Sequence, residues 1–146
     1  MNKKPLLALL AGGLLAGCGG SSGGSSNAIP PDLLTANWSG TWTQGSPGVY
    51  RGTLSVAIAK TAPGVFSVQG TVHDNDRGDG AVDGFLYPKD GTVNITFPFP
   101  GSEGFGHESY SGKLSMDDRG HLVGLLRIGG SIGDPTLAIF DLGFVP

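Results

Sequence analysis

The chain has 146 residues, of which 9 are Lys or Arg and 12 are Asp or Glu, giving a formal net charge of −3 at pH 7. This length suits a single domain with one modest hydrophobic core. The slightly acidic balance and the lack of a Lys/Arg run argue against nucleic-acid binding, which depends on neutralising phosphates.

The N-terminal segment has the pattern of an export signal. Lys3 and Lys4 form a short basic region, and the apolar run Leu6–Leu15 follows. This run is about half of the ~20 residues that a membrane-spanning helix needs. We therefore expect residues 1–17 to be a signal peptide that is removed on export.

The segment ends in Leu15-Ala16-Gly17-Cys18. The small residues at 16 and 17 suit signal cleavage, and Cys18 is the only cysteine, so it has no partner for an internal disulfide. The alternative is an ordinary cleaved signal followed by a chance cysteine. The stretch resembles the lipobox of bacterial lipoproteins, which implies lipidation of Cys18 and acylation of its amine. Three acyl chains exceed the roughly two that stable anchoring needs.

The resemblance also implies a location. Position 19 is Gly rather than Asp, and in an envelope with two membranes the lipoprotein family then favours the outer membrane. We therefore expect an exported protein that is anchored to the cell envelope through the lipid on Cys18.

A linker separates the anchor from the folded part. Gly19–Ser26 contains only Gly and Ser, which gives a flexible coil with a root-mean-square span of roughly 15–20 Å. Asp32–Ala36 is suited to one helical turn after Pro30-Pro31. We assign residues 18–37 to the lipidated cysteine and linker, and residues 38–146 to a single all-β domain.

From Trp38 onward, apolar and polar residues alternate in short runs separated by Gly, Pro, Asp and Asn, which indicates strands and turns. One dry face and one wet face favour antiparallel pairing. The predicted strands are Trp38–Gln44, Tyr50–Lys60, Val65–His73, Ala81–Tyr87, Thr92–Pro98, Glu108–Met116, His121–Ile128 and Thr136–Phe144.

The connections between these strands are short, so each strand is expected to pair with its neighbour in sequence. An eight-stranded antiparallel up-and-down meander that closes into a small barrel leaves no free edge. A β-sandwich is the alternative. Glycines recur near strand positions where a barrel bends sharply; they are Gly40, Gly52, Gly70, Gly91 and Gly112.

The first strand contains Trp38-Ser39-Gly40-Thr41-Trp42, in which both indoles share one face and are expected to point inward. This stretch resembles the Gly-x-Trp opening of avidin and lipocalin barrels, the calycins. The resemblance implies that Trp42 closes one end of the barrel. The last strand, however, has no Arg or Lys to stack on this tryptophan, and the later tryptophans of the avidin site are missing, so biotin binding is not implied.

No stretch forms a convincing catalytic or metal site. The acidic loop His73–Gly80 departs from a calcium-binding loop and is predicted to be a solvated hairpin of turn-forming residues. Gly129–Gly133 fits a nucleophile pattern, but a strand follows instead of the required helix. We expect no catalytic residues, no metal and no cofactor.

Two functions from different classes remain open. The first is a non-catalytic envelope lipoprotein with a filled core, which has a structural role or binds an envelope protein through its outer face. The second is a barrel that holds a small apolar ligand near Trp38, Trp42 and Tyr50. A hydrolase is a distant third. The expected partners are the membrane, through the lipid on Cys18, and either an envelope protein or a small apolar ligand.

Overall fold

The structure is a computed structural model that describes residues 28–45, 50–97, 108–129 and 137–146. The signal peptide, Cys18 and the linker as far as residue 27 lie outside the described residues. A short helix, α1 (Pro31–Leu34), precedes eight strands. The strands are β1 (Ala36–Gln44), β2 (Tyr50–Ala62), β3 (Val65–Asp74), β4 (Gly78–Tyr87), β5 (Thr92–Phe97), β6 (Glu108–Met116), β7 (Leu122–Ile128) and β8 (Leu137–Val145).

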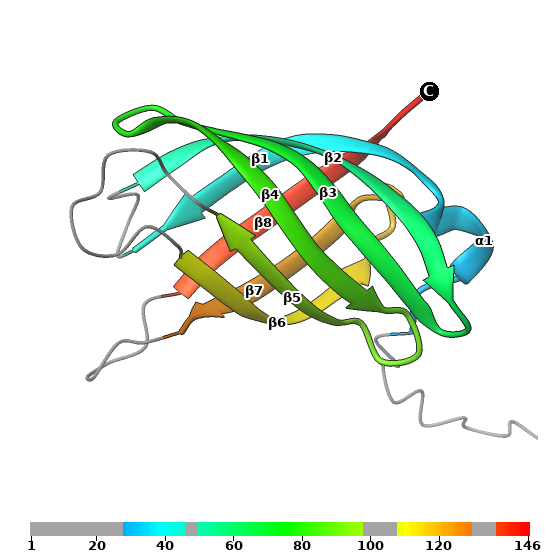
Figure 1. Cartoon of the computed structure of the whole chain (residues 1–146). Helices are drawn as coiled ribbons and strands as arrows, with labels where there is room; N and C mark the ends of the chain where they lie inside the picture. The colour runs from blue at the N-terminus through cyan, green and yellow to red at the C-terminus, as the bar shows by residue number, and fades with distance from the viewer. Residues whose placement is uncertain (1–27, 46–49, 98–107, 130–136) are drawn as a thin grey trace, which may run out of the picture.

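The eight strands form one closed antiparallel barrel (Figure 1). Each strand pairs with the next, and β8 returns to pair with β1 from Asn37↔Val145 to Gln44↔Ala138. The predicted meander and its closure are confirmed, and the alternative sandwich is wrong. Closure satisfies the backbone groups that an open sheet would leave at its edges.

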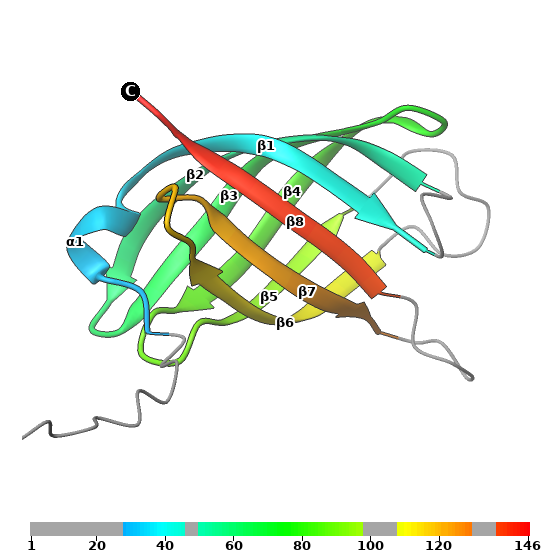
Figure 2. The same ribbon diagram turned by 180° about the vertical axis from the view of Figure 1, so that it is seen from behind.

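The two ends of the barrel differ. We call the end that carries α1 and the end of β8 the helix end, and the end that carries the β3–β4 turn the hairpin end. Figure 2 shows α1 and the C-terminus together at the helix end, opposite the β3–β4 hairpin. The described chain begins at Ala28 on the helix end, where the Ile29 amide donates to the Pro88 carbonyl at 2.9 Å.

The period-two pattern places the apolar side chains inside the barrel. The inward residues predicted on the second, third and fifth strands are all buried, whereas Met116 on β6 is only partly buried. These buried side chains are Leu54, Val56, Ile58, Phe66, Val68, Val72, Val93, Ile95 and Phe97. Burial of this set, together with the inward side chains of the other five strands, supplies the hydrophobic stabilisation of the fold.

Glycines stand where neighbouring strands approach most closely. A Cβ on Gly40 would fall onto the backbone of Asp141, and one on Gly52 would fall onto the backbone of His73. These two positions accept no side chain, which lets the sheet coil tightly enough to close. Gly91 lies in the turn before β5 with φ of 73°, a backbone conformation that glycine adopts readily.

The helix end is capped by the segment that enters the barrel. Ile29 and Leu34 are buried, and the Trp38 Nε1 donates to the Leu34 carbonyl at 3.1 Å. This bond ties α1 to β1. The ring of Phe144 meets the Trp38 indole edge-on, with centroids 6.0 Å apart, at the mouth of the barrel.

Candidate functional site

The interior near the hairpin end is a cluster of four aromatic side chains, which we call the aromatic layer. Its members are Trp42, Phe97, Tyr110 and Phe140, and each is 0% exposed. Phe97 and Tyr110 have ring centroids 4.7 Å apart, and Tyr110 lies 5.8 Å from Phe140. These spacings are those of packed aromatic pairs.

The aromatic layer closes the lumen. Trp42 belongs to β1 and Phe97 to β5, and these strands stand four places apart in a ring of eight. Their ring centroids are nevertheless only 5.6 Å apart at an interplanar angle of 69°. Side chains from opposite walls therefore touch at the barrel axis, and the space that a central ligand would need at this level is occupied.

A polar cluster covers the aromatic layer at the hairpin end, and Arg77 is at its centre. The Arg77 Nε donates to the Asp74 carboxylate at 2.7 Å, and its Nη1 donates to the Glu108 carboxylate at 2.6 Å. Asp74 also accepts hydrogen bonds from the backbone amides of Asp76 and Arg77, at 2.8 and 3.0 Å. The cluster thus links the β3–β4 hairpin to the start of β6 across the mouth.

This finding corrects the prediction of a solvated loop at His73–Gly80. The hairpin forms, but the Asp74 side chain is fully buried and that of Arg77 is 21% exposed. The loop composition indicated a turn correctly. It did not reveal that ring closure brings Glu108, which is distant in sequence, to within reach of the hairpin.

Arg77 also stacks on aromatic rings. Its guanidinium carbon lies 4.4 Å from the centroid of the Tyr50 ring and 5.8 Å from that of Trp42. These distances permit cation–π attraction. The last strand contains no Arg or Lys, and the cation beside Trp42 comes from the β3–β4 hairpin.

The electrostatics of the cluster favour its charged form. Burial acts to raise the pKa of the Asp74 carboxyl, but the hydrogen bonds from Asp76 and Arg77 outweigh burial and hold this pKa below its ordinary value. The Tyr110 hydroxyl lies 2.6 Å from the Glu108 carboxylate and 2.8 Å from the Gln44 side-chain oxygen. Burial and the nearby Glu108 raise the pKa of Tyr110, so this hydroxyl keeps its proton.

The three residues predicted to hold a ligand do not form one site. The rings of Trp42 and Tyr50 both lie beside the Arg77 guanidinium at the hairpin end. Trp38 precedes Trp42 by four residues, which is roughly 13 Å along a strand, and it packs under α1 at the helix end. The inward orientation predicted for both indoles is confirmed.

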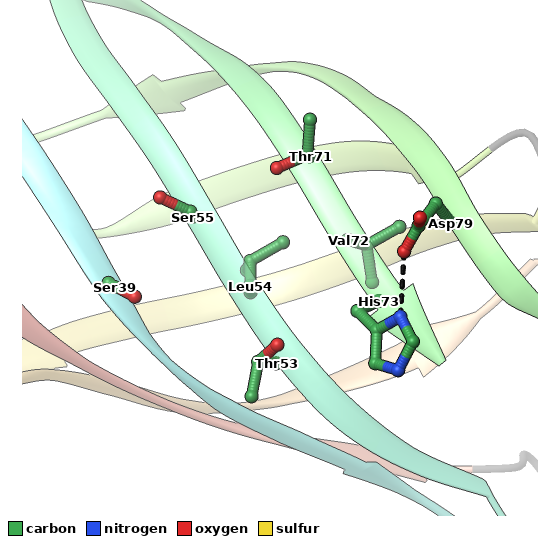
Figure 3. A pocket seen from close by; sticks show the side chains of 8 residues that line it. All are labelled: Ser39, Thr53, Leu54, Ser55, Thr71, Val72, His73 and Asp79. Carbon is green, nitrogen blue, oxygen red and sulfur yellow. Dashed lines mark hydrogen bonds and ion pairs between the residues drawn. The ribbon is translucent and has the colours of Figure 1, made fainter. Parts of the chain in front are cut away.

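The outer wall carries an open hollow with a volume of about 280 Å³, whose lining combines six polar residues with Leu54 and Val72 (Figure 3). Ser39, Ser55 and Thr71 lie side by side on β1, β2 and β3. Nearer the hairpin end, His73 on β3 is paired with Asp79 on β4, and the His73 Nδ1 lies 2.7 Å from the Asp79 carboxylate. These hydroxyl, imidazole and carboxylate groups can form hydrogen bonds with a polar partner.

A different part of the outer wall is apolar. Leu125 on β7 and Ile139 on β8 are directly paired across the strands, and each is more than half exposed. Leu137 lies beside them on β8 and is also exposed. We call these three residues the β7–β8 patch. Clustered exposed apolar side chains of this kind mark interaction surfaces.

Over the part of the chain that the structure covers, no three His, Cys, Asp or Glu side chains gather so as to hold a metal ion. The same residues include no helix that is long and apolar enough to cross a membrane. Most of the Gly129–Gly133 motif lies outside the described ranges.

No protein-family description matches the sequence, and no curated protein is significantly similar to it.

Proposed function

We propose that this chain is a lipid-anchored protein of the bacterial cell envelope with a structural or protein-interaction role and no catalytic activity. The observation that carries the proposal is the contact between Trp42 and Phe97 across the barrel axis. A lumen filled by its own side chains leaves the outer wall as the surface on which the protein acts.

The anchor segment and the outer wall of the barrel supply the remaining support. The lipobox-like stretch before Cys18 and the Gly/Ser linker favour a tethered barrel. The β7–β8 patch favours a protein partner, because a pair of directly opposed, exposed aliphatic side chains gains from being covered.

Substitution of Cys18→Ala is expected to release the exported protein from the membrane fraction and to change its electrophoretic migration, because the acyl chains are then missing. Cell fractionation followed by immunoblotting measures both effects.

A photo-crosslinking residue at Ile139 in the otherwise unchanged chain is expected to give an adduct with an envelope protein in intact cells. Mass spectrometry of the adduct identifies the partner.

Position 85 provides the matched control for the cross-link, since Phe85 is an exposed aromatic side chain on β4, away from the β7–β8 patch. A Cys18→Ala protein that stays in the membrane fraction with the same migration would rule out the lipid anchor. Equal adducts from positions 139 and 85 would rule out the patch as the interaction surface.

A further inference from the structure

The helix end carries an apolar groove with a volume of about 360 Å³ that no part of the described chain fills. Its lining includes Leu33 of α1, Ala36 and Trp38 of β1, Met116 of β6 and Phe144 of β8. Leu33 is 51% exposed and Phe144 is 58% exposed. Val145, next to Phe144, is exposed as well. Large side chains are thus presented to the surroundings on two separate elements at one end of the barrel.

The same end is the one to which the linker attaches. Ala28 follows Cys18 by ten residues, and a Gly/Ser-rich coil of this length spans roughly 15–20 Å. The bond from the Ile29 amide to the Pro88 carbonyl fixes the entry point of the chain at this end. A lipid on Cys18 would therefore hold the groove close to the bilayer and keep the hairpin end away from it.

The charges around the groove favour apolar rather than electrostatic contact with lipid. The exposed cations Lys60, Lys89 and Arg119 lie in or beside the turns of this end, together with the exposed carboxylates Asp32, Asp90 and Asp118. Such a mixed surface lacks the basic cluster that binds anionic headgroups. Adhesion of this end would rest on buried apolar area, as it does for interfacial segments.

We infer that the helix end docks on the bilayer that holds the lipid of Cys18, with Leu33, Phe144 and Val145 seated at the boundary between headgroups and acyl chains. This inference rests on the lipid anchor of the proposed function and adds an orientation to it. The barrel then stands on its helix end, and the β7–β8 patch and the hydroxyl-lined hollow face the aqueous space.

The test uses the lipidated protein in phosphatidylcholine vesicles, with an environment-sensitive fluorophore on Leu33→Cys. Cys18 is blocked by its lipid, so the introduced thiol is the one that reacts. We expect the label at position 33 to be quenched by nitroxide-bearing lipids, and its quenching constant for aqueous iodide to be about fivefold lower than that of a label on Asp76→Cys at the hairpin end. These results should be the same at low and high salt.

A second variant ties the result to the groove. Phe144→Asp in the Leu33→Cys background places a charge among the lipids, and we expect it to restore iodide quenching to the level of position 76. Phe85→Asp on the barrel wall is the control and should leave the shielding unchanged. Phe144 is largely exposed, so the variant is expected to fold, and circular dichroism checks this.

The outcomes separate the docking from the anchor. Protein that fails to float with the vesicles contradicts the lipid anchor itself. Protein that floats, with labels at positions 33 and 76 equally accessible to iodide, keeps the anchor and overturns the docking. Shielding at position 33 without nitroxide quenching also overturns it, because a second copy of the chain or another protein then covers the groove.

Discussion

Phe97→Ala is expected to lower the free energy of unfolding by about 3–5 kcal/mol. Phe97 is 0% exposed and contacts Trp42, Tyr110 and Phe140, so its removal leaves a cavity in the aromatic layer that strands of a closed barrel cannot easily collapse to fill. Denaturant unfolding followed by circular dichroism measures the change.

The matched control is Phe85→Ala, which removes the same atoms from a side chain that is 47% exposed on β4. Its effect should stay within about 0.5 kcal/mol. The cavity in Phe97→Ala should also bind benzene, as apolar engineered cavities do, and the ligand should raise the melting temperature of this variant alone. A loss below about 1 kcal/mol for Phe97→Ala would contradict tight packing at the barrel axis.

Arg77→Met is expected to lower the free energy of unfolding by about 2–4 kcal/mol at pH 7, because it leaves the buried Asp74 carboxylate and its neighbour Glu108 without their cation. The cost should shrink as the pH falls below about 4. The pKa of Asp74 is lowered in the folded protein, so its ionised form stabilises the fold above the unfolded pKa and loses this effect as the pH falls through the folded pKa. Urea unfolding at a series of pH values checks both parts.

Arg51→Met provides the control, since Arg51 is an exposed arginine on β2, the strand that also carries Tyr50. It should change stability by no more than about 0.5 kcal/mol at any pH. If Arg77→Met and Arg51→Met behave alike, the polar cluster does not hold the hairpin end together.

The alternation of residues along the strands carries most of the information about the fold. Val93, Ile95 and Phe97 repeat with a period of two, and this period alone assigns them to the interior of an antiparallel sheet. Short turns then favour the meander, and the need to satisfy the strand edges favours closure. The same alternation predicts inward orientations for Trp38 and Trp42, and both are buried.

The polar cluster at the hairpin end was not predictable in the same way. Asp74 and Arg77 lie in a loop whose composition is fully accounted for by turn formation. Their contacts with Tyr50, Trp42 and Glu108 arise only when the ring closes and brings distant strands to one mouth. The sequence signal for this cluster is one arginine, Arg77, among the acidic residues of the hairpin. This signal does not identify the partner of the arginine.

The separation of the predicted ligand residues has a similar cause. Residues of one strand face share an orientation but differ in their position along the barrel axis, and three residues of β1 lie between the two tryptophans. Periodicity reports which face a side chain occupies and is silent on what meets it from the opposite wall. The contact between Trp42 and Phe97, on which the filled lumen depends, is therefore a property of the closed barrel.

The most direct test of the filled lumen follows the emission of Trp42 in a Trp38→Phe variant while the protein is titrated with a panel of small apolar ligands. Trp42 lies in the aromatic layer, whereas Trp38 lines the groove at the helix end, so emission from Trp42 alone reports a molecule that enters the lumen at the aromatic layer. A barrel closed by its own side chains predicts no saturable change in emission. A saturable change with one ligand per chain would contradict it and would make the protein a ligand-binding barrel.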